Sequence, residues 1–161
     1  MKSTSSSDVL LPTRWLIRSD LQRVVDIDYE SFPVVWTEEN FSTALRSRNT
    51  IGMVIDVDDR VEGYMIYELH KSTLIITRMA VAENCRLQGV GRSLVHRLIS
   101  KLSPDRRNTV AVFVRESNLT AQVFFRSLGF RANKILYEYF EDPAEDAYRM
   151  VYRINADSMG S

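Results

Sequence analysis

The stretch RLQGVGRSLVHRLISKL, Arg86–Leu102, places Gly89 and Gly91 at the start of a segment that otherwise favours a helix. Glycine in a helix interior costs about 1 kcal/mol relative to alanine, so the two glycines need another explanation. Apolar residues at helical spacing follow them and predict a helix to about Leu102. Because the first N–H groups of a helix lack internal partners and lie in positive potential, the glycines indicate a place where an anion approaches the backbone.

Three phosphate-binding patterns compete for this loop. A P-loop ends in Gly-Lys-Ser/Thr, which does not occur in the sequence. A dinucleotide fingerprint needs a small residue where Leu94 stands, and an acidic residue about 20 positions further on, where the chain has Ala111 among apolar neighbours. The third pattern, Arg/Gln-x-x-Gly-x-Gly/Ala, fits residues 86–91. The alternative without a ligand is a helix that merely begins at two glycines.

Composition limits the class of protein. The chain has 161 residues, 45% hydrophobic and 26% charged, as in an ordinary globular protein with one domain. Lys+Arg and Asp+Glu balance at 21 each, and no apolar run reaches the length of a membrane span, so we expect neither a nucleic-acid nor a membrane partner. The single cysteine, Cys85, excludes an internal disulfide framework, and we expect it to be structural in a cytoplasmic protein. His70 and His96 lack the spacing of a metal site, so no metal is expected.

Cap and turn signals divide the chain into the order β-α-α-β-β-β-α-β-α-β-β. This order mixes an antiparallel meander with helical crossovers, and it indicates an α+β, or mixed α/β, fold around one sheet. We expect flexible tails at residues 1–13 and 155–161 around a single domain at 14–154. Strands are expected at 15–18, 51–57, 61–69, 74–81 and 109–114, with two more around 138–147. A first helix is expected at 20–29, capped by Ser19, and a second to about residue 46, capped by Thr37. A later helix is expected to be capped by Asn118 or Ser117 and to end at Gly129.

The loop Arg86-Leu87-Gln88-Gly89-Val90-Gly91 resembles the acetyl-CoA pyrophosphate loop of the GNAT N-acetyltransferase superfamily. RMAVAENCRLQGVGRSLV is similar to the central strand, loop and helix of that family, and VRESNLTAQVFFRSLGF to its next strand and helix. Within the superfamily, YESFPVVW and Glu145-Asp146-Ala147 with Met150 resemble the ribosomal-protein-alanine (RimI-like) branch. The resemblance spans roughly Trp15 to Tyr152. It implies a mostly antiparallel sheet, splayed at its middle strands and flanked by about four helices.

The resemblance implies an enzyme that transfers an acetyl group from acetyl-CoA to an amine by direct attack in a ternary complex. The expected acceptor is the α-amino group of a protein or peptide N-terminus, such as that of a ribosomal protein; a lysine or a small amine is the alternative. The coenzyme contacts that it implies are Met79, Ala80, Val81, Arg86, Leu87, Gln88, Gly89, Val90, Gly91, Arg92, Asn118 and Phe125. The acceptor contacts that it implies are Phe32, Pro33, Trp36 and Tyr137. The sequence gives no oligomeric state.

The proton-handling residues depart from the branch. Phe113 and Phe125 stand where RimI-like enzymes have a glutamate and a tyrosine, so the resemblance leaves the general base and the acid open. Tyr139 is the candidate to protonate the leaving thiolate, directly or through water; the alternative is an edge aromatic that packs or holds substrate. The two phenylalanines also favour a second class, a degenerate module that binds acyl-CoA without turnover. The acidic segment 138–146 either attracts a cationic acceptor or is a solvated loop.

Overall fold

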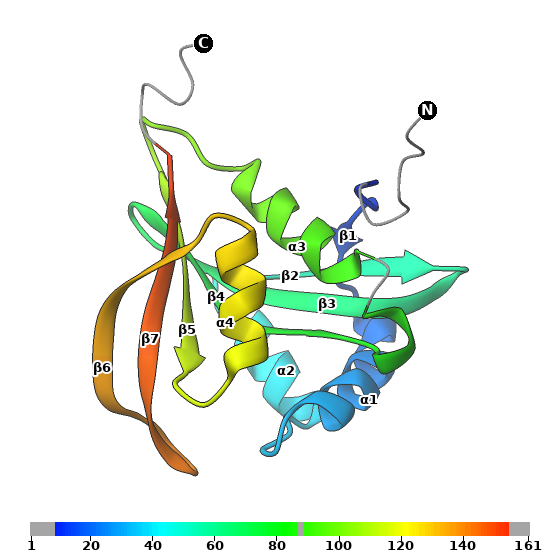
Figure 1. Ribbon diagram of the computed structural model, residues 1–161. Helices are drawn as coiled ribbons and strands as arrows, with labels where there is room; N and C mark the ends of the chain where they lie inside the picture. Colours follow the sequence, from blue (N-terminus) through cyan, green and yellow to red (C-terminus); the bar gives the residue numbers. More distant parts are fainter. Residues whose placement is uncertain (1–8, 87–88, 155–161) are drawn as a thin grey trace, which may run out of the picture. The chain divides into compact units, whose positions relative to one another are not determined.

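A computed structural model describes residues 9–86 and 89–154 of the chain, and its element order is the one expected from the sequence (Figure 1). The strands are β1 (Arg14–Trp15), β2 (Thr50–Val57), β3 (Arg60–Leu69), β4 (Thr73–Val81), β5 (Thr109–Arg115), β6 (Arg131–Glu141) and β7 (Ala144–Arg153). The helices are α1 (Leu21–Ser31), α2 (Glu38–Leu45), α3 (Val90–Ile99) and α4 (Leu119–Ser127), with short 3-10 helices η2 (Arg18–Asp20) and η3 (Glu83–Cys85).

Hydrogen bonding gives the strand order β1-β2-β3-β4-β5-β7-β6 in a seven-stranded sheet, which confirms the expected mixed α/β fold. The pairs β1–β2, β2–β3, β5–β7 and β6–β7 are antiparallel, whereas β4 and β5 are parallel. The parallel ladder begins at Thr73↔Thr109 and ends at Ile76↔Val112. β4 continues to Val81 and β5 to Arg115, so both strands extend beyond the end of this ladder.

Residue contacts divide the chain into two compact units. Within the described residues, the first unit holds 9–68, 78–86 and 89–100, and the second holds 69–77 and 101–154. The expectation of a single domain at 14–154 stays a prediction, and so do the expected tails, since residues 1–8 and 155–161 lie outside the described residues. Leu11, a described residue of the expected tail at 1–13, donates its N–H to Ser93 Oγ at 2.8 Å. Among the described residues, no helix has the length and hydropathy needed to cross a membrane.

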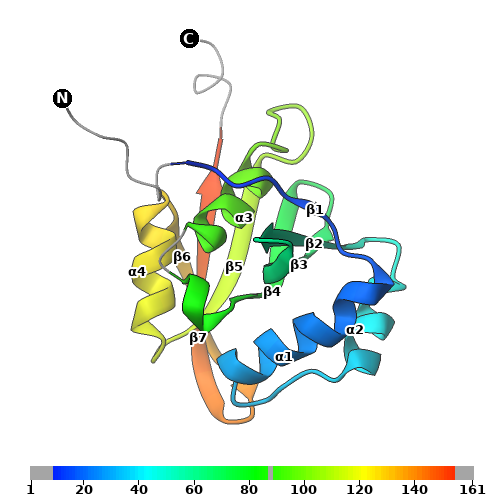
Figure 2. The same ribbon diagram turned by 90° about the vertical axis from the view of Figure 1, so that its right-hand side faces the viewer.

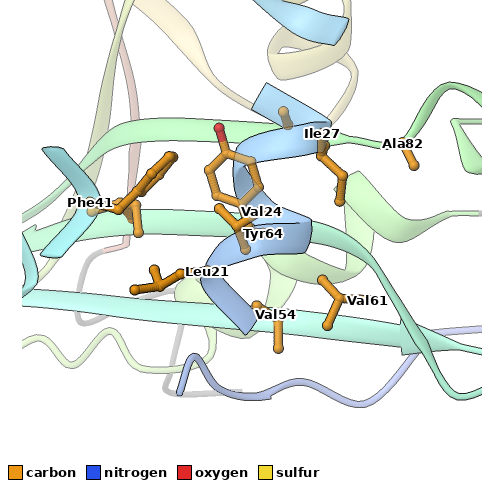
Figure 3. Close-up of a cluster of buried hydrophobic side chains, with 10 residues drawn as sticks. Leu21, Val24, Ile27, Phe41, Val54, Val61, Tyr64 and Ala82 are labelled. Atoms are coloured by element: carbon orange, nitrogen blue, oxygen red, sulfur yellow. The ribbon is translucent and has the colours of Figure 1, made fainter. Parts of the chain in front are cut away.

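The core of the first unit forms where α1 and α2 meet β2 and β3. Leu21, Val24 and Ile27 of α1 are buried against the strands, and Phe41 of α2 joins them (Figure 3). The two helices lie next to each other (Figure 2). Thr37 caps α2 as expected: its hydroxyl accepts from the Asn40 N–H at 3.1 Å. α1 ends at Ser31, just before Phe32 and Pro33, also as expected.

The second unit builds its core from aromatic rings. Phe125 of α4 meets Phe130 edge-on at 5.1 Å between ring centroids, and Phe130 lies 5.8 Å from Tyr152 of β7. Gly129 adopts φ 97°, which confirms the expected left-handed glycine after α4. β5 is buried along most of its length, as its apolar sequence predicts.

The expected first strand and first helix cap are wrong in detail. β1 covers only Arg14–Trp15, and Ser19 lies within η2 rather than capping α1. The carboxylate of Asp20 accepts from the Ile17 N–H at 2.8 Å and pairs with Arg14 at 2.9 Å. This carboxylate, rather than the Ser19 hydroxyl, therefore turns the chain from β1 into α1.

Candidate active site

The start of α3 has the backbone geometry and the lack of acidic side chains that an anion site requires. Gly89 is its N-cap residue and has φ 78°, a left-handed conformation that glycine adopts without strain. The Ser93 N–H donates to the Gly89 carbonyl at 3.0 Å, so the N–H groups of Val90, Gly91 and Arg92 precede the helical ladder. No acidic residue stands in the first turn to satisfy them or to offset the helix dipole.

Two arginines flank this helix start. Nη2 of Arg92 is buried and has no hydrogen-bond partner among the described residues, so a buried cationic donor is left over for a ligand. Arg86 is exposed, and its Nε donates to the Val81 carbonyl at 3.2 Å. The predicted coenzyme residues Leu87 and Gln88, between these arginines, lie outside the described residues.

The first turn of α3 lies very close to β3. A methyl group built on Gly63 would overlap Cγ1 of the buried Val90, so only glycine at position 63 leaves room for this turn. The sequence pattern indicated a close approach to the backbone at Gly89 and Gly91, but it did not point to Gly63 on the neighbouring strand β3. A glycine inside an apolar strand was the available signal.

The predicted thioester segment, Met79-Ala80-Val81, forms the end of β4 beyond the ladder with β5. Ala80 is buried, whereas Met79 and Val81 are half-buried. The Arg86 side chain ties this end to the neighbouring loop through Val81, and its Nη2 donates to Ser31 Oγ at 3.4 Å. In the first unit, the strand end, the loop arginine and the end of α1 therefore come together.

The predicted acceptor residues Phe32 and Trp36 are half-buried, and Pro33 is exposed. The guanidinium of Arg78, one residue before Met79, lies over the Phe32 ring at 4.2 Å and over the Trp36 ring at 4.8 Å. Arg78 also pairs with Asp28 at 2.6 Å. The connection between α1 and α2 is thus held against the strand that carries the predicted thioester segment.

Asp28, Tyr64 and Arg78 form a polar cluster that sequence reasoning missed. Asp28 is fully buried and accepts from the Tyr64 hydroxyl, from Arg78 and from the Trp36 N–H at 2.8 Å. Burial, and then donation to Asp28, raise the pKa of Tyr64 above its usual range. The sequence did hold a signal, because Asp28 continues the apolar face that Leu21 and Val24 form on α1.

In the second unit, Asn118 caps α4. Its Oδ1 accepts from the Ala121 N–H at 3.0 Å, which selects it over Ser117 as the cap. The side-chain amide of Gln122 donates to the carbonyls of Arg115 and Glu116 at 3.1 and 2.8 Å and so fixes the turn from β5 into α4. The oxygen of Asn118 is engaged in the cap, and the group it can offer a coenzyme is its NH2.

Phe113 and Tyr139 stack face to face in the second unit. Their ring centroids are 5.0 Å apart and the planes differ by 14°. Glu138 has φ 52°, and the β6–β7 register shifts between Leu136 and Phe140, so Tyr139 lies within an irregularity of β6. The Tyr139 ring is 48% exposed.

Among the described residues, the other predicted aromatic residues of the second unit, Tyr137 and Phe125, make no ring contact with that stack. Tyr137 is 76% exposed. Phe125 is only 6% exposed and packs edge-on against Phe124 and Phe130, a placement that favours a core role.

The acidic segment is partly used to hold its own hairpin. The Glu145 carboxylate accepts from the Ser117 N–H at 2.6 Å and pairs with Arg115 at 3.3 Å. These contacts with Ser117 and Arg115 hold the pKa of Glu145 below its usual range. The Asp146 carboxylate accepts from the Glu138 N–H at 2.8 Å. At least these two carboxylates therefore have structural partners.

Cys85 is buried at the end of η3, close in sequence to the glycine loop. Burial, and then the carboxylate of Glu62, raise the pKa of its thiol. A thiol that stays protonated is a poor nucleophile, which supports the structural role expected for it.

Known proteins with a similar sequence and fold were found across most of the chain. The chain is 29% identical over 133 residues to an uncharacterized N-acetyltransferase of Methanocaldococcus jannaschii, covering 82% of this chain and 85% of that one. It is 27% identical over 146 residues to an N-alpha-acetyltransferase of Sulfurisphaera tokodaii, covering 82% and 86%. The crystal structure of the ribosomal-protein-S18-alanine N-acetyltransferase of Escherichia coli matches with TM-score 0.78 and 25% identity, over 89% and 94% of the two chains.

A family model described as an acetyltransferase (GNAT) domain matches residues 19–139, which include the glycine loop and residues of both units. The match and the fold confirm the resemblance found in the sequence. This chain belongs to the GNAT family of acetyltransferases, enzymes whose acetyl donor is acetyl-CoA.

Proposed function

We propose that this chain acetylates the α-amino group of a protein N-terminus. The observation that carries the proposal is the anion site at the start of α3, where a left-handed Gly89, a first turn without acid and the unsatisfied Arg92 Nη2 coincide. This arrangement supports binding of the coenzyme diphosphate. The acceptor class is supported by the relatives, which include an N-alpha-acetyltransferase and an acetyltransferase named for the alanine of a ribosomal protein.

Two parts of the coenzyme have structural support in the chain. The diphosphate is assigned to the first N–H groups of α3 and to the two flanking arginines. The end of β4 that extends beyond its ladder with β5 offers backbone groups to the amide-bearing arm of the coenzyme. The residues assigned to the coenzyme are Met79, Ala80, Val81, Arg86, Leu87, Gln88, Gly89, Val90, Gly91, Arg92 and the NH2 of Asn118. The acceptor is assigned to Phe32, Pro33, Trp36 and Tyr137.

Acetyl-CoA supplies the thioester carbonyl that a neutral amine attacks: the C–N bond forms, the C–S bond breaks, and the proton that leaves nitrogen ends on sulfur. An α-amino group has a pKa of about 7.7–8.0, against about 10.4 for lysine, so a weak base suffices near neutral pH. The main contribution of the chain is to hold both reactants in line. The Tyr139 hydroxyl, held by its stack on Phe113, is assigned to the proton that reaches sulfur, directly or through water.

The test is release of free thiol from acetyl-CoA with three matched acceptors: a peptide with a free N-terminus and an internal lysine, the same peptide N-acetylated, and a polyamine. We expect release with the first and at least tenfold less with the other two. Equal release with the free and the N-acetylated peptide would show that the acceptor is the internal lysine. Release with the polyamine alone would show that the acceptor is a small amine.

A second candidate, a module that binds acyl-CoA without turnover, is favoured by one observation. Phe113 stands where the resembled branch has a glutamate, and its ring is covered by Tyr139. Tight coenzyme binding by calorimetry, with no thiol release above background for any acceptor, would select this candidate.

A further inference from the structure

The connection between α1 and α2, residues 32–37, is held by a buried ion pair. Asp28 is fully buried, and Arg78 donates to both of its oxygens, from Nε at 2.6 Å and from Nη2 at 2.9 Å. The Trp36 N–H donates to the same carboxylate at 2.8 Å, and the Tyr64 hydroxyl also donates to it. One carboxylate therefore joins α1, β3, β4 and the connection itself.

Arg78 contacts the connection at three alternate positions, 32, 34 and 36. Its Nη2 donates to the Val34 carbonyl at 2.8 Å, and its guanidinium covers the rings of Phe32 and Trp36. Only a planar guanidinium combines a bidentate pair, a carbonyl contact and two ring contacts, since an ammonium group has neither the fork nor the face. We call the pair Asp28 and Arg78 the clamp.

The clamp holds the backbone of the connection and leaves part of its apolar surface in solvent. Val34 is 50% exposed and Val35 is 36% exposed. Apolar packing of similar volume often stabilises a fold as well as or better than a buried ion pair, so stability alone does not account for an arginine here. A precise backbone position beside exposed valines is what an acceptor site requires.

We propose that Asp28 and Arg78 are positioning residues for the acceptor, holding residues 32–37 in register with the β4 segment Met79–Val81. The inference rests on the proposed function, because it takes this connection as one wall of the acceptor site. Arg78 immediately precedes Met79 in the chain, so the Arg78 side chain fixes the acceptor wall relative to the strand segment assigned to the thioester. Acceptors with an apolar residue near the amine fit the exposed valines.

The test compares Arg78→Lys with Arg23→Lys. Arg23 is a matched control in the same unit: it also pairs with a buried carboxylate, Glu62, at 2.9 Å and donates to a backbone carbonyl, that of Val61, at 2.9 Å. For Arg78→Lys we expect the KM for the acceptor peptide to rise about tenfold or more, while the coenzyme Kd changes less than twofold. For Arg23→Lys both quantities should stay within twofold of wild type.

Hydrogen exchange gives a readout that needs neither substrate. The Trp36 amide, which donates to Asp28, should exchange at least tenfold faster in Arg78→Lys than in Arg23→Lys when exchange at the core strand β3 is equal in the two variants. A wild-type enzyme that acetylates peptides, with Arg78→Lys and Arg23→Lys indistinguishable in acceptor KM, would overturn the positioning role alone. A wild-type protein that acetylates no N-terminal peptide would instead overturn the proposed function, and the acceptor role of the clamp with it.

Discussion

At the scale of single residues, the proposed role of Tyr139 as proton donor can be tested by removing its hydroxyl alone. Replacing it with phenylalanine keeps the ring that stacks on Phe113 and removes only the hydroxyl. We expect kcat to fall about 100-fold, the lower end of what a positioned proton donor contributes, with acceptor KM within twofold. Steady-state thiol release measures both, and Tyr29→Phe is the control because Tyr29 is 74% exposed and belongs to neither assigned site. A rise in KM with kcat unchanged would make Tyr139 a substrate contact only.

Gly89 gives a second prediction at this scale. The strain that alanine would suffer at its positive φ can be separated from the loss of the proposed anion site by comparison with another glycine of positive φ. Alanine in a left-handed conformation costs about 1–2 kcal/mol. Gly89→Ala and Gly129→Ala should therefore destabilise the protein by comparable amounts, since both glycines have positive φ, 78° and 97°. Only Gly89→Ala should weaken coenzyme binding, by about tenfold in calorimetry. Equal coenzyme affinity in the two variants would show that the diphosphate does not bind at the start of α3.

Residues with local signals were predictable, and residues that act across the fold were not. The glycine loop, the Asn118 cap and the left-handed Gly129 are each marked by a few neighbouring positions in sequence. The clamp joins Asp28 to Arg78, which is 50 positions away, and no local pattern encodes that pairing. The only trace of it is a carboxylate on an otherwise apolar helix face.

At the scale of elements, the ends of helices and strands were predicted well where a cap or turn residue coincides with a change in the spacing of apolar residues. Thr37 begins α2, and the Asp58-Asp59 turn joins β2 to β3, with φ of 53° and 64° at its two aspartates. The error at the start of α1 has a physical cause. Ser19 and Asp20 are both good caps in isolation, and the ion pair with Arg14 favours Asp20. The expectation that β4 and β5 separate came only from the family resemblance.

The contact between α3 and β3 gives a prediction about elements. Gly63→Ala should destabilise the protein by about 1–3 kcal/mol, because its methyl group overlaps Val90 in a packed core. Val90→Ala removes the overlapping atom, so the double variant should be less destabilised than the sum of the two single changes. Urea unfolding of the four proteins measures the coupling. Strict additivity would show that the start of α3 shifts freely away from β3.

At the scale of the whole molecule, the stability should depend on the protonation of His96. Burial, and then the charge of Arg92, hold the pKa of His96 below its ordinary 6.5. The unfolded chain therefore binds more protons than the folded one between that lowered value and pH 6.5. The contribution is fully present above pH 6.5 and is lost as the pH falls through this window. His96→Gln should consequently lose less stability than wild type between pH 7.5 and pH 5.5 in urea unfolding.

The same histidine reports where the coenzyme binds. If the diphosphate lies against Arg92, it offsets the positive charge that disfavours the imidazolium, and the pKa of His96 must rise when coenzyme A is added. The chain has two histidines, so NMR titration can follow each imidazole and use His70 as the internal control. By linkage, coenzyme affinity should then increase as the pH falls through the titration of His96, and His96→Gln should abolish that part of the dependence. An unchanged His96 pKa in the saturated complex would mean that the diphosphate binds away from Arg92, whatever the enzyme acetylates.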